Sequence, residues 1–399
     1  MRILVVMTHY PYPPRTGSAI LAYRNIKELA KRHSIHFVCA DDAKERGDLD
    51  EFVEHIEFVR RKNRSLFIKL LRYAFYMLRG FPAWMISSMS NEMRSRVTQL
   101  IDQQDFDAIL LYEITAIQYC PQFSYKNMIV NIEDPPSLKL DRLRALEVWS
   151  FWQKVSLYVL GKLTARYEKS VIPKLAKVLV LSETDLSDLH EQQGYNNLGC
   201  VTYGIDEIPS AEIVSYERRE EGMIVFSGNM HHPPNVDGAL FFLRHILHLV
   251  LKEYPSAKLW IVGASPDSRI LSAAKSFKEH VVVTGKVGNL SEYIRFATVC
   301  VCPVRLKIGV QTKILEALCW GTPVVTTSAG NNGIQGSSGK QLWVEDAPDQ
   351  FARHVAALLR GENWHTLSGE GRKLVTEHFT WERNTAELEQ NLEFVRNAA

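Results

Sequence analysis

The sequence lacks the features that mark several large classes of protein. Its 399 residues include six cysteines without any CxxC spacing, so neither a disulfide framework nor a short-spaced zinc site is indicated. Lysine and arginine number 47 against 45 aspartate and glutamate, and a net charge of +2 is too small for a dedicated nucleic-acid binder. The first apolar run, residues 3–7, is too short for a signal peptide, so we expect a cytoplasmic protein.

Common cofactor and hydrolase signatures are also missing. No GxGxxG follows the first predicted strand, and Gly336-Ser337-Ser338-Gly339-Lys340 has its glycines too close together for a P-loop. Neither HExxH nor GxSxG occurs. Asp105-Phe106-Asp107 resembles a metal-binding DxD but directly precedes an apolar strand, so we interpret it as a solvated turn. We therefore expect no cofactor and no metal.

What the sequence does contain is a regular alternation of apolar runs and amphipathic, helix-length stretches. Continuous apolar strands that alternate with helices are typical of parallel sheets covered on both faces. In the second half, each run is expected to be followed by a helix. The predicted strands are residues 3–7, 35–40, 108–112, 128–132, 178–181, 223–226, 257–262, 281–284, 299–303 and 323–327.

The alternation restarts after a polar stretch, residues 207–222, which we interpret as a linker. The predicted fold is α/β, with two doubly wound, Rossmann-like domains that face a central cleft. We expect an N-terminal domain of residues 1–203, a C-terminal domain of 204–380, and a final helix, 381–399, that crosses back to the first domain. In such folds ligands bind outside the carboxyl ends of the strands.

Two stretches of the N-terminal half combine aromatic and basic residues. Residues 60–90 begin with Arg60-Arg61-Lys62-Asn63-Arg64 and continue with many aromatics, and residues 140–174 place Trp149, Phe151 and Trp152 among arginines and lysines. A basic stripe beside an aromatic face suits a helix that lies in a membrane interface. The alternative is that these helices pack on their own domain and expose their charges to water.

Two loops are candidate ligand sites. The first strand is followed by a proline-rich loop that closes on Gly17 at a helix N-terminus, which fits either an anionic ligand or an ordinary turn. In the C-terminal half a strand leads into a loop with Arg305, Lys307 and Gly309, and a helix begins near Gln311. The helix N-terminus and the cations indicate an anion site, and Glu316, one turn further on, suits a sugar diol. A surface network of charges is the alternative.

The sequence resembles the retaining glycosyltransferases of family 4, which have the two-domain GT-B fold. The resemblance covers nearly the whole chain and is strongest over residues 224–334. It is carried by Phe226-Ser227-Gly228-Asn229-Met230, Pro234-Asn235-Val236-Asp237, Trp260-Ile261-Val262-Gly263 and, most specifically, Lys313-Ile314-Leu315-Glu316-Ala317-Leu318 followed by Gly321-Thr322-Pro323-Val324-Val325. Tyr203-Gly204-Ile205-Asp206 resembles the family's interdomain junction, and the loop with Gly17 resembles an exopolysaccharide-synthesis subgroup.

The resemblance implies roles for matching positions. Glu316 is the second glutamate of the family's E-x7-E motif and is expected to hold the ribose, whereas Ile308 replaces the first glutamate. Relatives carry an arginine and a lysine after the strand that ends at Gly228, but the loop of residues 229–235 has neither. We expect Arg305 and Lys313 to hold the diphosphate instead. The expected donor-binding residues are Gly17, Gly228, Asn229, Asn235, Gly263, Lys286, Val287, Gly309, Val310, Gln311, Thr312 and Glu316, with Lys286 and Val287 at the nucleobase.

The implied reaction moves a hexose from a nucleotide sugar, UDP in preference to GDP, to a saccharide or lipid-linked saccharide with retention of configuration. Arg305 and Lys313 would stabilise the departing phosphates without a metal, and His9, Glu113, Glu133 and Asp134 are candidates for orienting the acceptor. Bacterial polysaccharide synthesis is the expected setting, with peripheral contact to the inner membrane through 60–90 and 140–174. The alternatives are a nucleotide-sugar epimerase of the same architecture and a non-catalytic nucleotide-sugar-binding relative.

Overall fold

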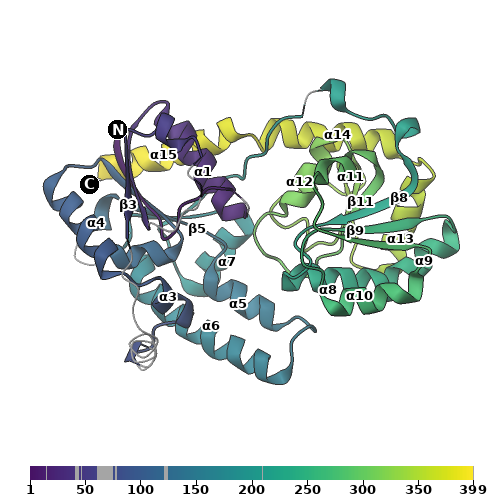
Figure 1. Ribbon diagram of the computed structural model, residues 1–399, viewed down its shortest axis with the longest axis horizontal. Coiled ribbons are helices and arrows are strands. Elements are labelled where there is room, and N and C mark those ends of the chain that lie inside the picture. Colours follow the sequence, from purple (N-terminus) through teal and green to yellow (C-terminus); the bar gives the residue numbers. More distant parts are fainter. Residues whose placement is uncertain are drawn as a thin grey trace. The chain divides into compact units, whose positions relative to one another are not determined.

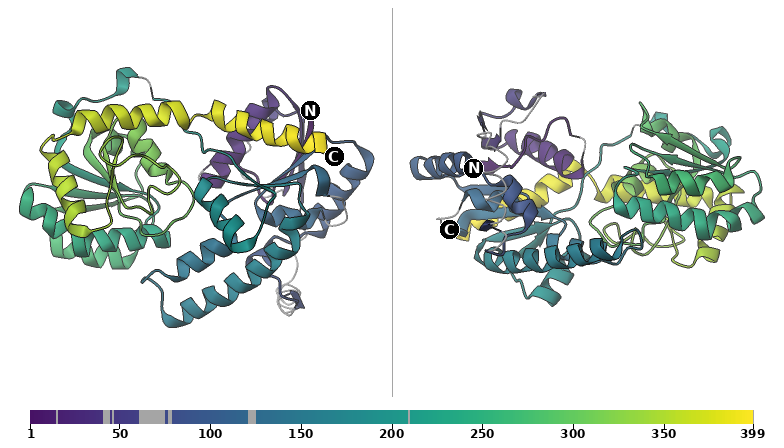
Figure 2. Two further views of the ribbon diagram at one scale, coloured as in Figure 1. Left: turned by 180° about the vertical axis from the view of Figure 1, so that it is seen from behind. Right: turned by 60° about the horizontal axis from the view of Figure 1, so that its bottom comes forward.

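The computed structural model describes residues 1–14, 16–40, 45, 47–60, 75–76, 79–120, 125–208 and 210–398 (Figure 1). The chain divides into two compact units. Unit 1 comprises Met1–Asp141, Val155–Gly204 and Trp381–Ala399, and unit 2 comprises Arg142–Lys154 and Ile205–Thr380. Each unit is built on a parallel sheet with helices on both faces (Figures 1 and 2). This confirms the predicted fold class of two doubly wound α/β domains.

The sheet of unit 1 has seven parallel strands in the order β3-β2-β1-β4-β5-β6-β7. Sequence order reverses between β1 and β4, and this switch point is where doubly wound folds bind ligands. The strands are β1 (Arg2–Val6), β2 (Ser34–Ala40), β3 (His55–Val59), β4 (Ala108–Tyr112), β5 (Met128–Glu133), β6 (Lys177–Val180) and β7 (Leu198–Cys200).

Seven α-helices are assigned among the described residues that build the two faces of this sheet, together with short 3-10 turns. The helices are α1 (Gly17–Ala30), α3 (Ala83–Ser88), α4 (Asn91–Gln103), α5 (Pro136–Arg144), α6 (Phe151–Val171), α7 (Glu183–Gln193) and α15 (Trp381–Ala398). The turns are Leu49–Glu51, Ile114–Tyr119, Tyr125–Asn127 and Ile172–Lys174.

Alternate residues of each strand enter two separate hydrophobic cores. In β1, Leu4 and Val6 face the core that contains residues of α4, whereas Ile3 and Val5 face the core that contains residues of α1. The second core is completed by Leu388, Leu392 and Val395 of α15, all fully buried. Figure 2 shows α15 (yellow) beside α1 (purple). The last helix of the chain therefore covers part of the sheet formed by its beginning.

The sheet of unit 2 has six parallel strands in the order β10-β9-β8-β11-β12-β13, with its switch point between β8 and β11. The strands are β8 (Glu220–Ser227), β9 (Lys258–Val262), β10 (Val281–Gly285), β11 (Ala297–Cys302), β12 (Val324–Thr326) and β13 (Trp343–Val344). The helices are α8 (Pro233–Phe241), α9 (Leu247–Glu253), α10 (Ser268–Ala274), α11 (Leu290–Phe296), α12 (Thr312–Cys319), α13 (Pro348–Leu359) and α14 (Trp364–His378). A π-helical turn, Phe242–Ile246, joins α8 to α9, and 3-10 turns lie at Ser210–Glu212, Tyr216–Arg218 and Lys275–Phe277.

Two sequence-based expectations about unit 2 are wrong. The expected linker, residues 207–222, runs into the sheet, because β8 already begins at Glu220 and its first two residues are exposed and polar. No helix follows β12. A segment rich in glycine, serine and asparagine leads instead to β13, which pairs with β12 in parallel.

Two smaller expectations can also be compared with the structure. Cys300 and Cys302 are free and buried in β11, as small core residues should be. Asp107 lies in the turn between α4 and β4, where its carboxylate accepts a hydrogen bond of 2.7 Å from the backbone N–H of Arg2. In the aromatic and basic stretch 60–90, residues 61–74 and 77–78 lie outside the described residues.

Candidate active site

The switch point of unit 2 is lined by backbone. Gly228, Gly263 and Gly285 stand at the carboxyl ends of β8, β9 and β10, each with a positive φ, and we call them the glycine edge. The peptides are so close that a Cβ on Gly263 would lie 1.7 Å from the Gly228 carbonyl oxygen, and a Cβ on Gly228 would lie 2.8 Å from Asn235 Nδ2. Side chains are thus excluded here, which leaves room for a ligand to approach the main chain.

Lys313 directs its ammonium group toward this edge. The residue lies in the first turn of α12, and its Nζ donates hydrogen bonds to Asn235 Oδ1 (2.7 Å) and Gln311 Oε1 (3.2 Å). Burial lowers the pKa of Lys313, because a desolvated ammonium group is disfavoured. Asn235, itself buried, is fixed by a second bond of 2.9 Å to the Asn229 carbonyl. Lys313 therefore has amide partners and no bonded carboxylate among the residues that the structure describes.

Glu316 lies one turn further along α12. Burial raises its pKa to about 7, although the positive charge of Lys313 acts in the opposite direction. A partly desolvated carboxylate with a cation three residues away is suited to accept hydrogen bonds from a neutral polyol. Lys313 and Glu316, which were predicted to bind the diphosphate and the ribose, therefore lie on one helix.

Arg305 is placed differently from Lys313. Its Nε and Nη2 atoms donate to the two carboxylate oxygens of Asp237 at 2.9 and 2.8 Å, and Asp237 is almost completely buried in α8. The Arg305 guanidinium also stacks 4.8 Å from the ring centre of Phe241. This bidentate pair neutralises Arg305 and ties the loop after β11 to α8.

The other predicted donor-binding residues of unit 2 occupy loops at the same edge of the sheet. Asn229 follows β8, Lys286 and Val287 follow β10, and Gly309 has a φ of 45° in the loop between β11 and α12. Val310, Gln311 and Thr312 lead into α12, and Gln311 is its N-cap residue. Ile308, in place of the family's first glutamate, is buried.

Unit 1 gathers carboxylates at the carboxyl ends of β4 and β5. Glu113 has a φ of 65°, and its Oε2 accepts hydrogen bonds from the hydroxyls of Thr8 (3.2 Å) and Thr115 (3.1 Å). Asp134 forms an ion pair of 2.8 Å with Lys139. We call Glu113, Glu133 and Asp134 the carboxylate cluster.

The surroundings of Glu133 strongly perturb its ionisation. Burial, followed by the charges of Asp134 and Glu113, raises its pKa to about 8, while a hydrogen bond from Ser18 and the charge of Lys139 act against this shift. It has a φ of 57°, and its Oε1 has no hydrogen-bond partner among the described residues. A carboxyl group that titrates near neutral pH is a candidate for proton transfer or acceptor binding.

The structure brings the predicted residues of the N-terminal loop to the same edge of unit 1. Gly17 is the first residue of α1, Thr16 caps the helix, and a Cβ on Gly17 would meet no described atom within 4 Å. His9 lies exposed in the loop after β1. His9, Gly17 and the three members of the carboxylate cluster thus belong to unit 1, and the remaining predicted site residues belong to unit 2.

Sequence reasoning missed several partners. Asp237 was part of a family-like motif, but nothing in the sequence pairs it with Arg305, 68 positions away. Ser18 and Thr8 flank the proline-rich loop and reach the carboxylate cluster only through the fold. Among the described residues, no group of three or more histidine, cysteine, aspartate or glutamate side chains is arranged to hold a metal ion.

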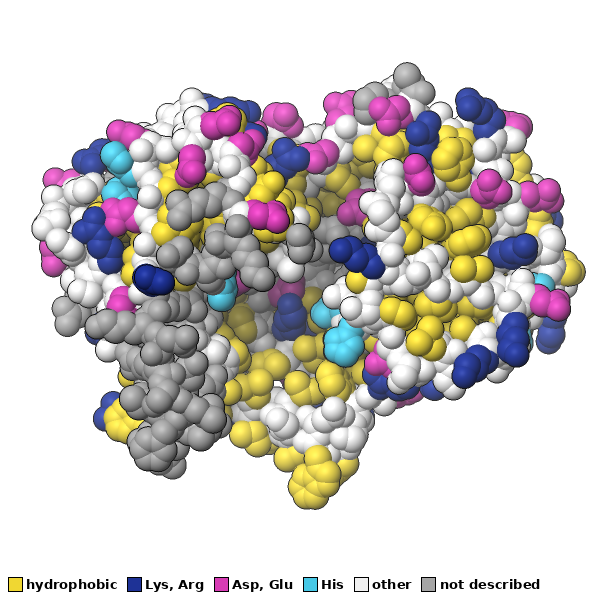
Figure 3. All heavy atoms as spheres, viewed as in Figure 1, with side chains coloured by type: hydrophobic (Ala, Val, Ile, Leu, Met, Phe, Trp, Pro, Cys, Tyr) yellow, Lys and Arg dark blue, Asp and Glu magenta, His cyan; other side chains and the backbone are white. Residues whose placement is uncertain are grey.

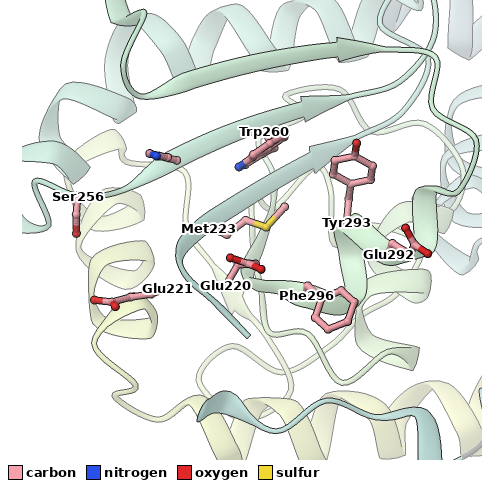
Figure 4. Close-up of a pocket in the computed structure, with 9 residues that line it drawn as sticks. Glu220, Glu221, Met223, Ser256, Trp260, Glu292, Tyr293 and Phe296 are labelled. Atoms are coloured by element: carbon pink, nitrogen blue, oxygen red, sulfur yellow. The ribbon is translucent and has the colours of Figure 1, made fainter. Parts of the chain in front are cut away.

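A cavity of about 680 Å³ lies elsewhere in unit 2 (Figure 4). It is lined by the first residues of β8 and β9 and by α11, and the rings of Trp260 and Tyr293 lie 5.7 Å apart in it. Its rim carries Glu220, Glu221 and Glu292. Because it opens near the amino ends of the strands, it is separate from the glycine edge.

Comparison with known proteins places this geometry in context. Residues 221–361 match the family model described as Glycosyl transferases group 1. The match covers about a third of the chain. The matched segment contains the whole glycine edge, Asn235, Lys313 and Glu316, so the match coincides with the site of unit 2.

Over the whole chain, the sequence identity to known proteins is low, whereas the similarity in fold is clear. An uncharacterized 44.6 kDa protein in the cps region of Klebsiella pneumoniae is 22% identical, over 89% of this chain and 90% of that protein. Sucrose-phosphate synthase from Thermosynechococcus elongatus superposes with a TM-score of 0.72 at 15% identity, over all of both chains. A mutant of S. aureus TarM, in complex with fondaparinux, α-GlcNAc-glycerol and UDP, gives 0.67 at 11% identity, over 98% of this chain and 100% of that chain. Domain match and fold together support a glycosyltransferase.

Proposed function

We propose that this protein transfers a hexose from a UDP-sugar to a saccharide or lipid-linked saccharide, with retention of configuration, in the synthesis of a bacterial polysaccharide. The observation that carries the proposal is the arrangement of Lys313 and Glu316 on α12 beside the glycine edge, inside the segment that matches the glycosyltransferase family. UDP in the TarM complex and the cps-region relative support the donor and the setting.

In the proposed reaction, unit 2 holds the donor. Glu316 accepts hydrogen bonds from the ribose diol, and the diphosphate lies between the glycine edge and the first turn of α12. Lys313 and the helix N–H groups then stabilise the charge that develops on the departing phosphates, which is the main electrostatic demand of the reaction. Arg305 acts less directly, because its hydrogen bonds to Asp237 hold the loop that leads into α12.

Unit 1 is proposed to hold the acceptor at the carboxylate cluster. Carboxylates and threonine hydroxyls are suitable partners for sugar hydroxyls, and the Oε1 atom of Glu133 retains its hydrogen-bonding capacity among the described residues. Retention is attributed to attack of the acceptor on the same face as the leaving group, with the departing phosphate accepting the proton. Because the phosphate takes this proton, Glu133 is not required as a base, and its proposed role is to orient the acceptor hydroxyl.

The proposal is tested by UDP binding and by transfer. We expect UDP to raise the thermal stability of the wild type. Lys313→Met and Glu316→Ala should each weaken UDP binding at least tenfold. Glu292→Ala, a control in the separate cavity, should bind UDP like the wild type. Product analysis with a radiolabelled UDP-hexose and a saccharide acceptor then checks catalysis. Absence of stabilisation by any UDP- or GDP-sugar would contradict the proposal.

One competing function has an observation in its favour. Ile308 replaces a family glutamate and Arg305 is engaged by Asp237, which fits a protein that binds nucleotide sugar without catalysis. Such a protein would bind UDP, would depend on Glu316, and would release no UDP from a UDP-hexose in the presence of any acceptor. An epimerase, by contrast, would convert the sugar without an acceptor.

A further inference from the structure

Helix α6 exposes an unusual concentration of large apolar side chains. Among the described residues, nine large hydrophobic side chains are exposed, and five of them are Phe151, Trp152, Val155, Tyr158 and Val159. At about 100° per residue these five fall within a sector of about 120°, so they form one face of the helix, which we call the apolar stripe. Phe151 and Trp152 are 71% and 77% exposed.

Cations continue the same face toward the C-terminal end of the helix. Lys162, Arg166 and Lys169 are exposed and fall in the same sector as the apolar stripe, and Lys162 Nζ lies 5.4 Å from the ring centre of Tyr158. From Phe151 to Tyr167 the helix has no acidic residue. Glu168, the first acid, is fully buried and bonded to the N–H of Ser137 at 2.9 Å.

The described part of the other aromatic stretch reaches the same helix. The ring of Tyr76 lies 5.6 Å from that of Phe81, which in turn lies 5.9 Å from Tyr167 of α6. Phe75, next in the chain, is exposed. Figure 3 shows hydrophobic side chains gathered over the α5–α6 hairpin. The described residues Tyr76 and Phe81 of the first stretch therefore lie beside α6, which belongs to the second.

We propose that α6 docks this protein on an anionic lipid surface, with the apolar stripe in the headgroup–acyl boundary and Lys162, Arg166 and Lys169 against lipid phosphates. The inference deepens the proposed function, on which it rests, because a lipid-linked acceptor is presented at a membrane. The exposed face, from Phe151 to Lys169, is about 27 Å long at 1.5 Å per residue, which suits a helix lying in the interface plane. No described helix is long and apolar enough to cross a bilayer.

The charge on the exposed face of α6 favours a lipid surface over a second copy of the chain as its binding partner. Pairing two such faces in parallel would bring like charges together, whereas an anionic bilayer offers apolar volume and negative charge to one surface. The two parts of the face then have separate effects. The apolar stripe sets how tightly the helix binds, and the cations set its preference for anionic lipid and its sensitivity to salt.

The test is co-sedimentation of the full chain with vesicles of phosphatidylcholine alone and of phosphatidylcholine with phosphatidylglycerol. We expect at least tenfold tighter binding to the anionic vesicles, weakened by salt. Phe151→Ser with Trp152→Ser should lose at least tenfold, while Phe394→Ser, a 57% exposed phenylalanine on α15, should bind like the wild type. Lys162, Arg166 and Lys169→Gln together should remove the anionic preference, and Lys275→Gln with Lys278→Gln should keep it.

Two further measurements keep the outcomes distinct. Brominated lipids should quench wild-type fluorescence more than that of Trp152→Phe, because Trp152 lies in the acyl boundary. UDP binding, measured on the same samples, should be equal in all these variants. A loss of vesicle binding can then be distinguished from a loss of nucleotide binding. Lack of wild-type binding to anionic vesicles, or a dimer in sedimentation velocity that Phe151→Ser with Trp152→Ser dissociates, would overturn the proposal.

Discussion

At the scale of single residues, buried carboxyl groups are informative only together with their surroundings. Burial raises the pKa of Glu316 and of Glu168 to about 7 in both cases. Glu168, however, lies in the interior of unit 1 with its oxygens bonded to Ser137, whereas Glu316 lies beside a buried ammonium group near a backbone-lined edge. A perturbed ionisation alone would therefore have selected both residues, and geometry separates them.

The ionisation of Glu316 leads to a pH-dependent prediction. A carboxylate accepts hydrogen bonds from both hydroxyls of a diol, and protonation removes part of this capacity. With a pKa of about 7, the ionised fraction rises roughly tenfold between pH 6 and pH 8. We expect UDP affinity, measured by calorimetry, to rise by up to about tenfold over this interval.

The matched control for this prediction is Glu316→Gln, which keeps the shape of the side chain and cannot ionise. Its UDP affinity should be lower at pH 8 and nearly constant from pH 6 to pH 8. An equal pH dependence in the wild type and in the glutamine variant would show that another group, such as the phosphate of UDP itself, is responsible.

At the scale of elements, the sequence predicted the central strands well because those strands are buried on both faces. Residues 108–112 were predicted and are β4 itself, and the other runs differ from their strands by a few residues at either end. The strands that were missed are at sheet edges or very short. β3 contains His55 and Glu57 among its five residues, β7 has three residues, and β13 has two. Apolar continuity is weak there because an edge strand is only partly buried.

The residues of the candidate site could likewise be predicted where their relation is local in sequence and could not where it is distant. Lys313 and Glu316 were found because they share one helix, and their spacing is local. The pairing of Arg305 with Asp237 and of Ser18 with Glu133 depends on strands that are distant in sequence. Charge and motif therefore identified the candidate residues, while their engagement could be seen only in three dimensions.

Helix α15 provides a prediction at the same scale. Leu388, like Leu392 and Val395 of the same helix, is fully buried in a core whose other members lie within residues 1–201. Leu388→Ala therefore leaves a cavity that should cost about 2–5 kcal/mol of stability. Phe394→Ala, on the exposed side of the helix, should change stability by about 0.5 kcal/mol or less. Urea unfolding measures both, and hydrogen exchange of β1 and β4 assigns the transition to unit 1. Equal effects of the two variants would contradict the packing.

At the scale of the whole molecule, the net charge of +2 hides an uneven distribution. Positive charge is concentrated along the exposed face of α6 and at the N-terminal end of α12, while unit 1 gathers Glu113, Glu133 and Asp134 at its carboxyl edge. Three chemically different surfaces, proposed to bind lipid, diphosphate and sugar hydroxyls, thus occur in one nearly neutral chain.

This separation predicts where UDP acts. All the proposed UDP contacts except Gly17 lie in unit 2, and a ligand that binds the native state suppresses local opening around its site by about 2.7 kcal/mol at one hundred times its Kd. Hydrogen exchange with saturating UDP should therefore slow most in residues 228–235, 285–287 and 309–316. The carboxylate cluster around β4 and β5 should change little, because it is proposed to bind the acceptor. Lys313→Met supplies the control, since it should remove the protection without altering exchange in β1. Slower hydrogen exchange in unit 1 alone would contradict the proposed placement of UDP in unit 2.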